Sequence, residues 1–147
     1  MFSGGHTNNM DIKGRVNVPA PFRDVLRHQY GDARMMITLD IFDNCLRAYP
    51  LQEWEAFLEK LRQQPSTNRT VRRITRRVVG SAFECEPDKQ GRVLLAPTLR
   101  DHASLQKTVH FSGHNNTFEI WSHELWQKET GQFDEPFDEG LLAELGI

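Results

Sequence analysis

Two short stretches of the sequence carry the residue types that proteins use to bind a phosphate or the edge of a base. The first, DIKGRVNVP, spans residues 11–19, and the second, DKQGRVLLAP, spans residues 88–97. Each places an aspartate four residues before an arginine, and a glycine directly before that arginine. Aspartate can accept hydrogen bonds from the backbone of its own turn, and glycine can adopt a positive φ without a steric penalty. Both stretches therefore predict a tight turn from which an arginine projects.

These turns have a structural and a functional interpretation. In the structural one, the motif is only a well-made turn, built by Asp11 and Gly14 in the first copy and by Asp88 and Gly91 in the second. In the functional one, the arginine reads a base, because a guanidinium can donate two hydrogen bonds to guanine O6 and N7. A two-stranded ribbon also fits the major groove of DNA. The sequence alone leaves both interpretations open.

The two turns differ in what they offer to DNA. The first carries Lys13 and Arg15, in the basic part of the chain. In the second, Gln90 stands where Lys13 stands, acidic residues precede the turn, and Arg92 is a secondary candidate. Lysine can reach either a base or a phosphate. We therefore expect the first turn to contribute more to recognition than the second.

The turns belong to an internal repeat. At an offset of 77 residues, DIKGRVNVPAPFRD aligns with DKQGRVLLAPTLRD, with six identical residues among 14. Two copies of about 70 residues are too few for a solenoid and favour a pseudo-twofold pair. Each copy reads as a strand, the turn, a second strand, a short helix, two more strands and a closing helix. The predicted divisions are a first repeat (1–65), a basic connecting helix (66–80), a second repeat (81–131) and an acidic tail (132–147).

The connecting helix is strongly basic. Val71, Ile74 and Val78 recur at helical spacing, and five arginines fall on the opposite side. Among these, Arg72, Arg73 and Arg76 are candidates for contacts with phosphate. The alternative is a solvated face, or a seam that pairs with acidic residues of a neighbouring subunit.

The distribution of charge is uneven along the chain. The net charge is −2, but residues 1–82 carry 13 basic and 8 acidic residues, whereas residues 83–147 carry 5 and 12. A basic half joined to an acidic half suggests that one half faces a polyanion. The same asymmetry could also let subunits meet head to tail.

Several classes of function find no support in the sequence. No apolar run approaches the roughly 20 residues of a membrane span, and the N-terminus has no signal-peptide pattern. The sequence contains no nucleophile motif and no glycine-rich phosphate loop, and its late histidines, including His110 and His114, read as ordinary loop and surface residues. Two cysteines, Cys45 and Cys85, read as reduced core residues. We therefore expect a cytoplasmic protein without catalytic residues, metal, cofactor, small-molecule substrate or membrane contact.

Taken together, these motifs resemble the MraZ family of bacterial transcription regulators, which are related to AbrB. The resemblance extends to about residue 130. It rests on the two turn motifs and on MF.G at the start, VP..FR (18–23), YP..EW (49–54), GRVLLAP.LR..A.L (91–105) and FEIW (118–121). Pro87 departs from the pattern, since it removes a backbone donor beside the second turn. The acidic tail matches none of the motifs that carry the resemblance.

The resemblance implies an α+β fold of two tandem AbrB-like swapped-hairpin β repeats that form a pseudo-twofold barrel, with short helices packed outside. It also implies a sequence-specific, nucleoid-associated DNA-binding regulator of a cell-division and cell-wall gene cluster. We expect this regulator to repress transcription. The expected partners are double-stranded promoter DNA with repeated sites and further copies of the chain in a ring-shaped homo-oligomer. The alternative is a protein-interaction module of the antitoxin-like barrel type.

Overall fold

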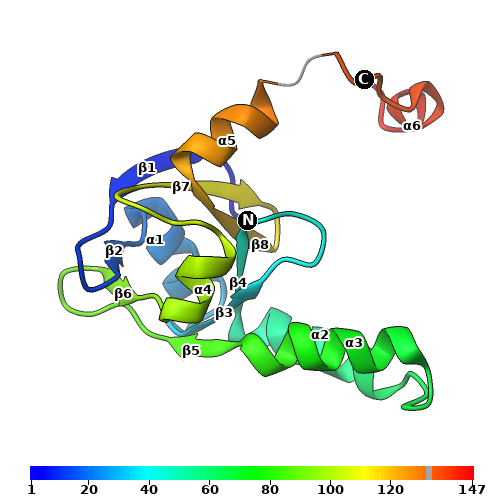
Figure 1. The fold of residues 1–147 in the computed structure, drawn as a ribbon, viewed down its shortest axis with the longest axis horizontal. Helices are drawn as coiled ribbons and strands as arrows, with labels where there is room; N and C mark the ends of the chain where they lie inside the picture. The colour runs from blue at the N-terminus through cyan, green and yellow to red at the C-terminus, as the bar shows by residue number, and fades with distance from the viewer. Residues whose placement is uncertain (132–133) are drawn as a thin grey trace.

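The computed structural model describes residues 1–131 and 134–147 and confirms the α+β class predicted from the sequence (Figure 1). The strands are β1 (Gly5–Asn9), β2 (Arg15–Asn17), β3 (Met35–Leu39), β4 (Leu46–Pro50), β5 (Phe83–Cys85), β6 (Arg92–Leu94), β7 (Thr108–His114) and β8 (Thr117–Ser122). The helices are α1 (Ala20–Gln29), α2 (Leu51–Arg62), α3 (Arg69–Arg77), the 3-10 turn η1 (Val79–Ser81), α4 (Pro97–His102), α5 (His123–Thr130) and α6 (Glu139–Glu144).

Six strands form one antiparallel sheet in the order β1-β7-β8-β4-β3-β5. At its centre, β4 of the first half pairs with β8 of the second, in a register that sets Ala48 opposite Phe118. The first strand of each half pairs with the third strand of the other half, because β1 lies beside β7 and β5 lies beside β3. The two halves of the sequence therefore exchange strands within one sheet.

The remaining strands, β2 and β6, form a separate two-stranded ribbon. The ribbon sets Val16 opposite Val93, and both side chains are buried. Because side chains alternate between the faces of a strand, the flanking Arg15, Asn17, Arg92 and Leu94 lie on the other face, toward solvent. The two copies of the predicted repeat thus pair with each other at this ribbon.

The closed barrel expected from the resemblance is absent from residues 1–131 and 134–147. The six-stranded sheet is open, with β1 and β5 at its edges. The ribbon strands are three residues long, since a glycine turn precedes each one and a helix with proline in its first turn follows it. Such short strands pair with each other and do not extend the ladder of the larger sheet.

The core lies between the sheet, the ribbon and helices α1 and α4. Phe22 of α1 packs against Phe118 of β8 with ring centroids 4.9 Å apart, and Phe2 packs against both rings. Leu26 of α1 and Leu99 of α4 are buried in the same cluster. These aromatic and aliphatic contacts join residues from both halves, so neither half buries its apolar face alone.

Helices α2 and α3 form an arm that projects from one side of the sheet (Figure 1). Both helices are confirmed where their apolar periodicity predicts them. The Asn68 side chain caps α3 by accepting hydrogen bonds from the backbone N–H groups of Thr70 and Val71, at 2.8 and 3.3 Å. At the base of the arm, the buried Thr38 hydroxyl donates to the carbonyl of Val78 at 2.6 Å, which ties α3 to the sheet.

Side-chain caps begin both C-terminal helices. Ser122 caps α5 by accepting a hydrogen bond from the Leu125 backbone at 3.2 Å. Asp138 caps α6, which lies in the predicted acidic tail. The first two positions of the predicted tail, 132 and 133, lie outside the described residues. Among the described residues, no helix is both long and apolar enough to span a bilayer.

Each half also completes the turn of the other half. Arg100 of α4 lies across Gly14, where an added Cβ would come within 2.8 Å of its Nε atom. Arg23 of α1 lies across Gly91, where an added Cβ would come within 2.6 Å of its Cζ atom. Both arginines donate from Nε to a backbone carbonyl of their own half, that of Val18 for Arg23. The glycines are therefore required for a close approach as well as for a positive φ, which is +93° at Gly14 and +82° at Gly91.

A pair of glycine substitutions separates these two requirements. Gly31 has a φ of +68° with nothing within 4 Å of an added Cβ, so Gly31→Ala should cost only about 1–2 kcal/mol of backbone strain. Gly91→Ala should cost about 1 kcal/mol more, because Arg23 must also leave its hydrogen bond. Urea denaturation of both variants, alone and combined with Arg23→Ala, measures the difference. Equal costs at Gly91 and Gly31 in the presence of Arg23 would show that the contact stabilises nothing.

Candidate nucleic-acid interface

The first turn is built around the Asp11 carboxylate. Its Oδ1 atom accepts hydrogen bonds from the backbone N–H groups of Lys13 and Arg15, at 3.0 and 2.9 Å. The backbone N–H of Gly14 donates to the Asp11 carbonyl at 3.0 Å, and the Asp11 N–H donates to the Arg15 carbonyl at 2.9 Å. Four hydrogen bonds therefore fix a segment of five residues.

The second turn repeats this pattern bond for bond. Asp88 Oδ1 accepts from the backbone N–H groups of Gln90 and Arg92, both at 2.9 Å. The N–H of Gly91 donates to the Asp88 carbonyl at 2.9 Å, and the Asp88 N–H donates to the Arg92 carbonyl at 2.8 Å. Pro87, which precedes the turn, does not alter this geometry.

Each aspartate also holds the arginine side chain of its own turn. Arg15 Nε lies 2.7 Å from Asp11 Oδ2, and Arg92 Nε lies 3.1 Å from Asp88 Oδ2. Within the described part of the chain, the Nη groups of both arginines make no hydrogen bond. The arginines are thus held at Nε, and their Nη donors stay available for guanine or phosphate.

Hydrogen bonds also set the charge state of both aspartates. The backbone N–H of Arg15, followed by its side chain, lowers the pKa of Asp11. The backbone N–H of Arg92, followed by that of Gln90 and the Arg92 side chain, lowers the pKa of Asp88. Both carboxylates are therefore ionised at neutral pH and available as acceptors.

The turns and the outer side of the ribbon form one surface, which we call the turn face. Asn17, on the ribbon, donates from its amide to the Gln90 carbonyl at 2.7 Å and so connects the first strand to the second turn. A pocket of about 450 Å³ lies beside the first turn, between Ile12 and Lys107. Seven basic residues from both halves lie in the turns or in the segments that contact them: Lys13, Arg15, Arg23, Lys89, Arg92, Arg100 and Lys107.

The sequence alone did not reveal the part that Arg23 and Arg100 take in this surface. Both lie within the repeated R-D pair, which is identical in the two copies, and that identity was the available signal. Their target is the glycine of the opposite turn, and a contact across halves cannot be read from spacing within one half.

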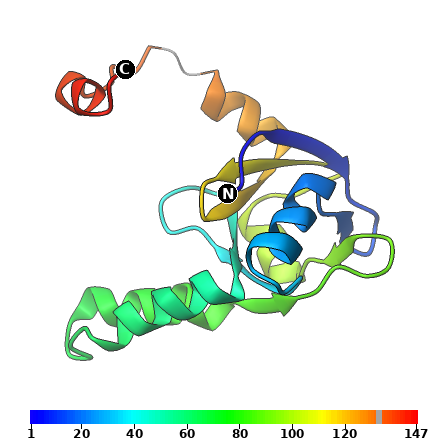
Figure 2. The same cartoon turned by 180° about the vertical axis from the view of Figure 1, so that it is seen from behind.

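The arginines of α3 lie elsewhere. The arm that carries them projects on the side away from the turn face in both views (Figures 1 and 2). Arg72 donates from Nη1 to the carbonyls of Thr67 and Ser66, at 2.6 and 3.4 Å, so it serves the loop before its own helix. Arg73 and Arg76 are exposed. The structure therefore does not bring the two predicted sets of DNA-binding residues together.

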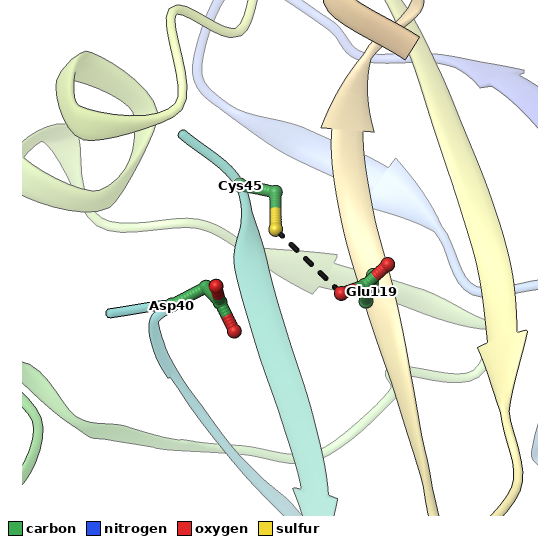
Figure 3. Close-up of side chains that lie close together, drawn as sticks. All are labelled: Asp40, Cys45 and Glu119. Carbon is green, nitrogen blue, oxygen red and sulfur yellow. Dashed lines mark hydrogen bonds between the residues drawn. The ribbon is translucent and has the colours of Figure 1, made fainter. Parts of the chain in front are cut away.

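A buried polar cluster at the end of the β3–β4 hairpin, beside β8, has the composition of a metal site. Asp40, Cys45 and Glu119 place their ligand atoms within 4.8 Å of one another (Figure 3). The Arg47 guanidinium already pairs with this group, since Nη2 lies 3.1 Å from Asp40 Oδ1 and 3.0 Å from Glu119 Oε2. Burial raises the pKa of the Cys45 thiol well above its ordinary value, followed by the nearby charges of Glu119 and Asp40, so the thiol is protonated within this network. The cluster is an ion-pair network.

The expectation for the late histidines was wrong at His110. This residue lies in the middle of β7, is 9% exposed and stacks on Trp126 of α5 with ring centroids 4.3 Å apart. Burial lowers its pKa, followed by the nearby charges of His123 and His6. An imidazole can replace an apolar side chain here because the aromatic ring of α5 covers it. His114, at the exposed end of the same strand, matches the expectation.

Comparisons with known proteins agree with the motifs. A family model for MraZ proteins, described as antitoxin-like, matches twice, over residues 1–77 and 78–142. The chain belongs to the MraZ family. It is 46% identical over 129 residues to the Transcriptional regulator MraZ of Shewanella denitrificans, with 88% of this chain and 84% of that protein covered. It is 40% identical over 147 residues to the protein of the same name from Nitrosococcus oceani, with 100% and 98% covered. For the one from Escherichia coli O127:H6, the identity is 43% over 143 residues, with 97% and 91% covered.

The aspartates of the turn face predict how acid affects this MraZ protein. A carboxyl group with a lowered pKa in the folded state stabilises the fold above its unfolded pKa, and this contribution disappears as the pH falls through the folded value. The pKa values of Asp11 and Asp88 lie below the ordinary value of 3.8, so their contribution should disappear below about pH 4. Thermal melts between pH 6 and pH 2.5 should show a shallower acid loss for the Asp11→Asn/Asp88→Asn variant than for the wild type. Equal acid losses in the variant and the wild type would contradict a stabilising role for the two carboxylates. NMR titration of the Asp11 and Asp88 carboxyl carbons measures their pKa values independently.

Proposed function

We propose that this chain is a sequence-specific DNA-binding transcriptional regulator that represses a cell-division and cell-wall gene cluster. The turn face carries the proposal. It presents two aspartate-held arginines from one two-stranded ribbon, and a ribbon of this kind fits the major groove. The relatives are named transcriptional regulators, which supports the same class of function.

The pairing with aspartate explains why arginine suits this position. A free arginine loses side-chain entropy when it binds a base, whereas Arg15 is already held at Nε by Asp11. Its Nη groups, together with a neighbouring lysine at residue 13, are then free to bind guanine and phosphate. A bidentate contact of this type discriminates against a wrong base by about 1–3 kcal/mol. Asp11 would act as a positioning residue without touching DNA.

The two turns present different side chains on the same backbone. Positions 12 and 13 carry Ile and Lys, while the equivalent positions 89 and 90 carry Lys and Gln. We infer that the halves are tandem swapped-hairpin repeats, because each contributes its first strand to the third strand of the other. One chain then supplies what a symmetric dimer of single repeats would supply, with two non-identical turns. The first turn would be the main reader, and Arg92 would contribute a weaker contact.

A single subunit is poorly suited to hold DNA alone. Its net charge is −2, and affinity for DNA comes chiefly from neutralised phosphates. Several copies displayed in a ring would bring several turn faces to repeated promoter sites, and linked contacts multiply affinity. The proposed assembly is therefore a ring-shaped homo-oligomer that acts on the nucleoid in the cytoplasm.

The α3 arginines are a less favourable DNA surface than the turn face. Arg72 is engaged by its own loop, and the arm points away from the ribbon. A contact of Arg73 or Arg76 with phosphate stays a prediction. The other interpretation of this helix, a seam with a neighbouring subunit, is developed below.

A second candidate function is a protein-interaction module, which the antitoxin-like description of the family favours. A gel shift with the DNA directly upstream of this protein's own gene distinguishes the two functions. A regulator of the proposed type shifts this duplex with affinity that falls steeply with salt, at a slope of about −0.9 per phosphate neutralised. A protein-interaction module leaves the duplex unshifted.

Arg15→Ala should abolish specific binding while the fold remains intact. The side chain is 39% exposed, and its loss removes a base contact worth about 1–3 kcal/mol per subunit, which compounds across an oligomer. Gel shifts with the upstream DNA, together with a thermal melt, measure both effects. Arg62→Ala is the matched control, because Arg62 is also exposed and paired with a carboxylate but lies on the arm. Wild-type affinity in a folded Arg15→Ala variant would reduce Arg15 to a part of the turn.

The oligomer should depend on repeated sites. Deleting one copy of the bound motif from a promoter with two or more copies should weaken binding by at least tenfold, because the linked contact is lost. Light scattering should give a mass above that of a dimer of the 17.0 kDa chain. A 17.0 kDa species that binds a single-motif duplex as tightly as the full promoter would contradict the avidity argument.

A further inference from the structure

The connection between β3 and β4 exposes a large aromatic side chain. Phe42 is 91% exposed, and its neighbour Ile41 is 43% exposed. The equivalent connection in the second half, between β7 and β8, contains two residues only, so this longer loop is specific to the first half. We call residues 40–44 the Phe42 loop.

The Phe42 loop is held rigidly from below. Asp40 is 7% exposed, and its Oδ2 atom accepts hydrogen bonds from the backbone N–H groups of Phe42 and Asp43, at 3.0 and 2.9 Å. Its Oδ1 atom accepts two hydrogen bonds from Arg47, at 3.2 and 3.1 Å. Buried hydrogen bonds therefore fix the backbone of the loop, while the Phe42 side chain stays exposed to solvent.

That network reaches the central strand of the other half. Arg47 also donates to Glu119 at 3.0 Å and to Thr117 at 2.9 Å, and Glu119 accepts from the Trp121 indole at 3.2 Å. The cluster of Asp40, Cys45 and Glu119 in Figure 3 is thus the foundation of the Phe42 loop. Breaking one partner of such a buried network is costly, so the loop conformation is strongly determined.

Phe42 lies between an apolar and a mainly polar pocket. On one side, a pocket of about 270 Å³ is lined by Ile41, Tyr49 and Phe57 among others. On the other, a pocket of about 230 Å³ combines Trp121 and Leu125 with charged residues, next to Phe42 itself. A preorganised aromatic residue between an apolar pocket and a charged rim has the anatomy of a binding hot spot.

Charge identifies the partner of this surface. The rim of the Phe42 loop carries Asp43 and Glu129, and the basic residue that lines the same pocket, Lys128, pairs with Glu124 at 3.6 Å. The five acidic residues of the described tail follow, with no basic residue among 134–147. A complementary surface must therefore be basic and must offer apolar side chains to Phe42.

The arginine side of α3 has this chemistry, because the aliphatic stems of arginines can pack on an aromatic ring while their charged ends face acidic residues. The helix contains no acidic residue, and within residues 1–131 and 134–147 none of its arginines at 69, 73, 76 and 77 lies in a salt bridge. Val71 and Ile74 are half-buried on the opposite side of the same helix. We infer that the Phe42 loop of one copy of the chain docks against α3 of a second copy. This interface rests on the oligomer of the proposed function and names the residues that build it.

Replacing the exposed ring tests the interface directly. Phe42→Ser should raise the dissociation constant of the oligomer at least about tenfold, as expected for a hot-spot aromatic residue, and light scattering should show smaller species. Phe137→Ser is the matched control, because Phe137 is 79% exposed but lies in the tail. An unchanged mass for Phe42→Ser at concentrations where the wild type begins to dissociate would overturn the inference.

Charge reversal on α3, the other side of the proposed interface, provides an independent test. Arg73→Glu/Arg76→Glu should also dissociate the oligomer, and adding Asp43→Lys/Glu129→Lys to it should restore association. Both sets of substitutions alter exposed side chains, and thermal melts check that each variant is folded. Dissociation without any restoration by the second pair would show that α3 meets a surface other than the Phe42 loop.

A photocrosslinker identifies the partner chain. With benzophenone-phenylalanine at position 42, in a mixture of ¹⁵N-labelled and unlabelled protein, the crosslinked peptides should pair residue 42 with residues 69–77 of the other isotope. Crosslinks to any other segment, or only within one chain, would contradict the proposal. Gel shifts on the same samples test DNA binding separately. If the wild type forms the oligomer but does not bind DNA, only the proposed function is contradicted. If the Phe42→Ser variant keeps the mass of the wild-type oligomer and binds DNA, only this inference is contradicted.

Discussion

The arginine of each short helix lies across the glycine of the opposite turn, and the rest of the structure depends on this reciprocal contact. Arg100 covers Gly14 and Arg23 covers Gly91, while the backbone N–H of the residue that follows each ribbon strand donates to the glycine carbonyl of the other turn. Neither turn can therefore form with its full set of contacts until both halves are present. The same exchange is visible in the sheet, where β1 joins β7 and β5 joins β3. Two repeats of about 70 residues thus share one core and complete each other's turns.

This constraint also shapes the chemistry of the turn face. Because the backbone of both turns is fixed by the same four hydrogen bonds, the side chains at positions 12 and 13, and at 89 and 90, can differ without changing the turn. The aspartates keep the arginines in place at Nε, and the Nη groups make no hydrogen bond within the described residues. The pseudo-twofold frame therefore supplies geometry, and the side chains on it supply whatever discrimination the protein has between sequences.

Local pattern predicted much of this fold, and long-range contacts account for what it missed. The repeat located both turns, and apolar periodicity located α2 and α3, because both signals lie within a few consecutive residues. Which strands pair across halves is decided by contacts between residues 46 or more positions apart, from Ile37 opposite Phe83 upward, so the sequence pattern did not reveal the open sheet that stands in place of the expected barrel. Arg23 and Arg100 were missed for the same reason. His110 was misjudged because a strand pattern says which side chains share a face, and not that Trp126 of a later helix covers that face.

The central strand pair connects the two surfaces that the sequence treated separately. Arg47 on β4 and Glu119 on β8 lie opposite each other in the register, and their ion pair reaches Asp40, which sets the Phe42 loop. The turn face is built from the ribbon on the other side of the same core, and the arm that carries α3 points away from it. The proposed DNA surface and the proposed subunit surface can therefore be occupied at the same time. Both are anchored in one exchanged core, so the geometry of each surface depends on contacts between the two halves of the chain.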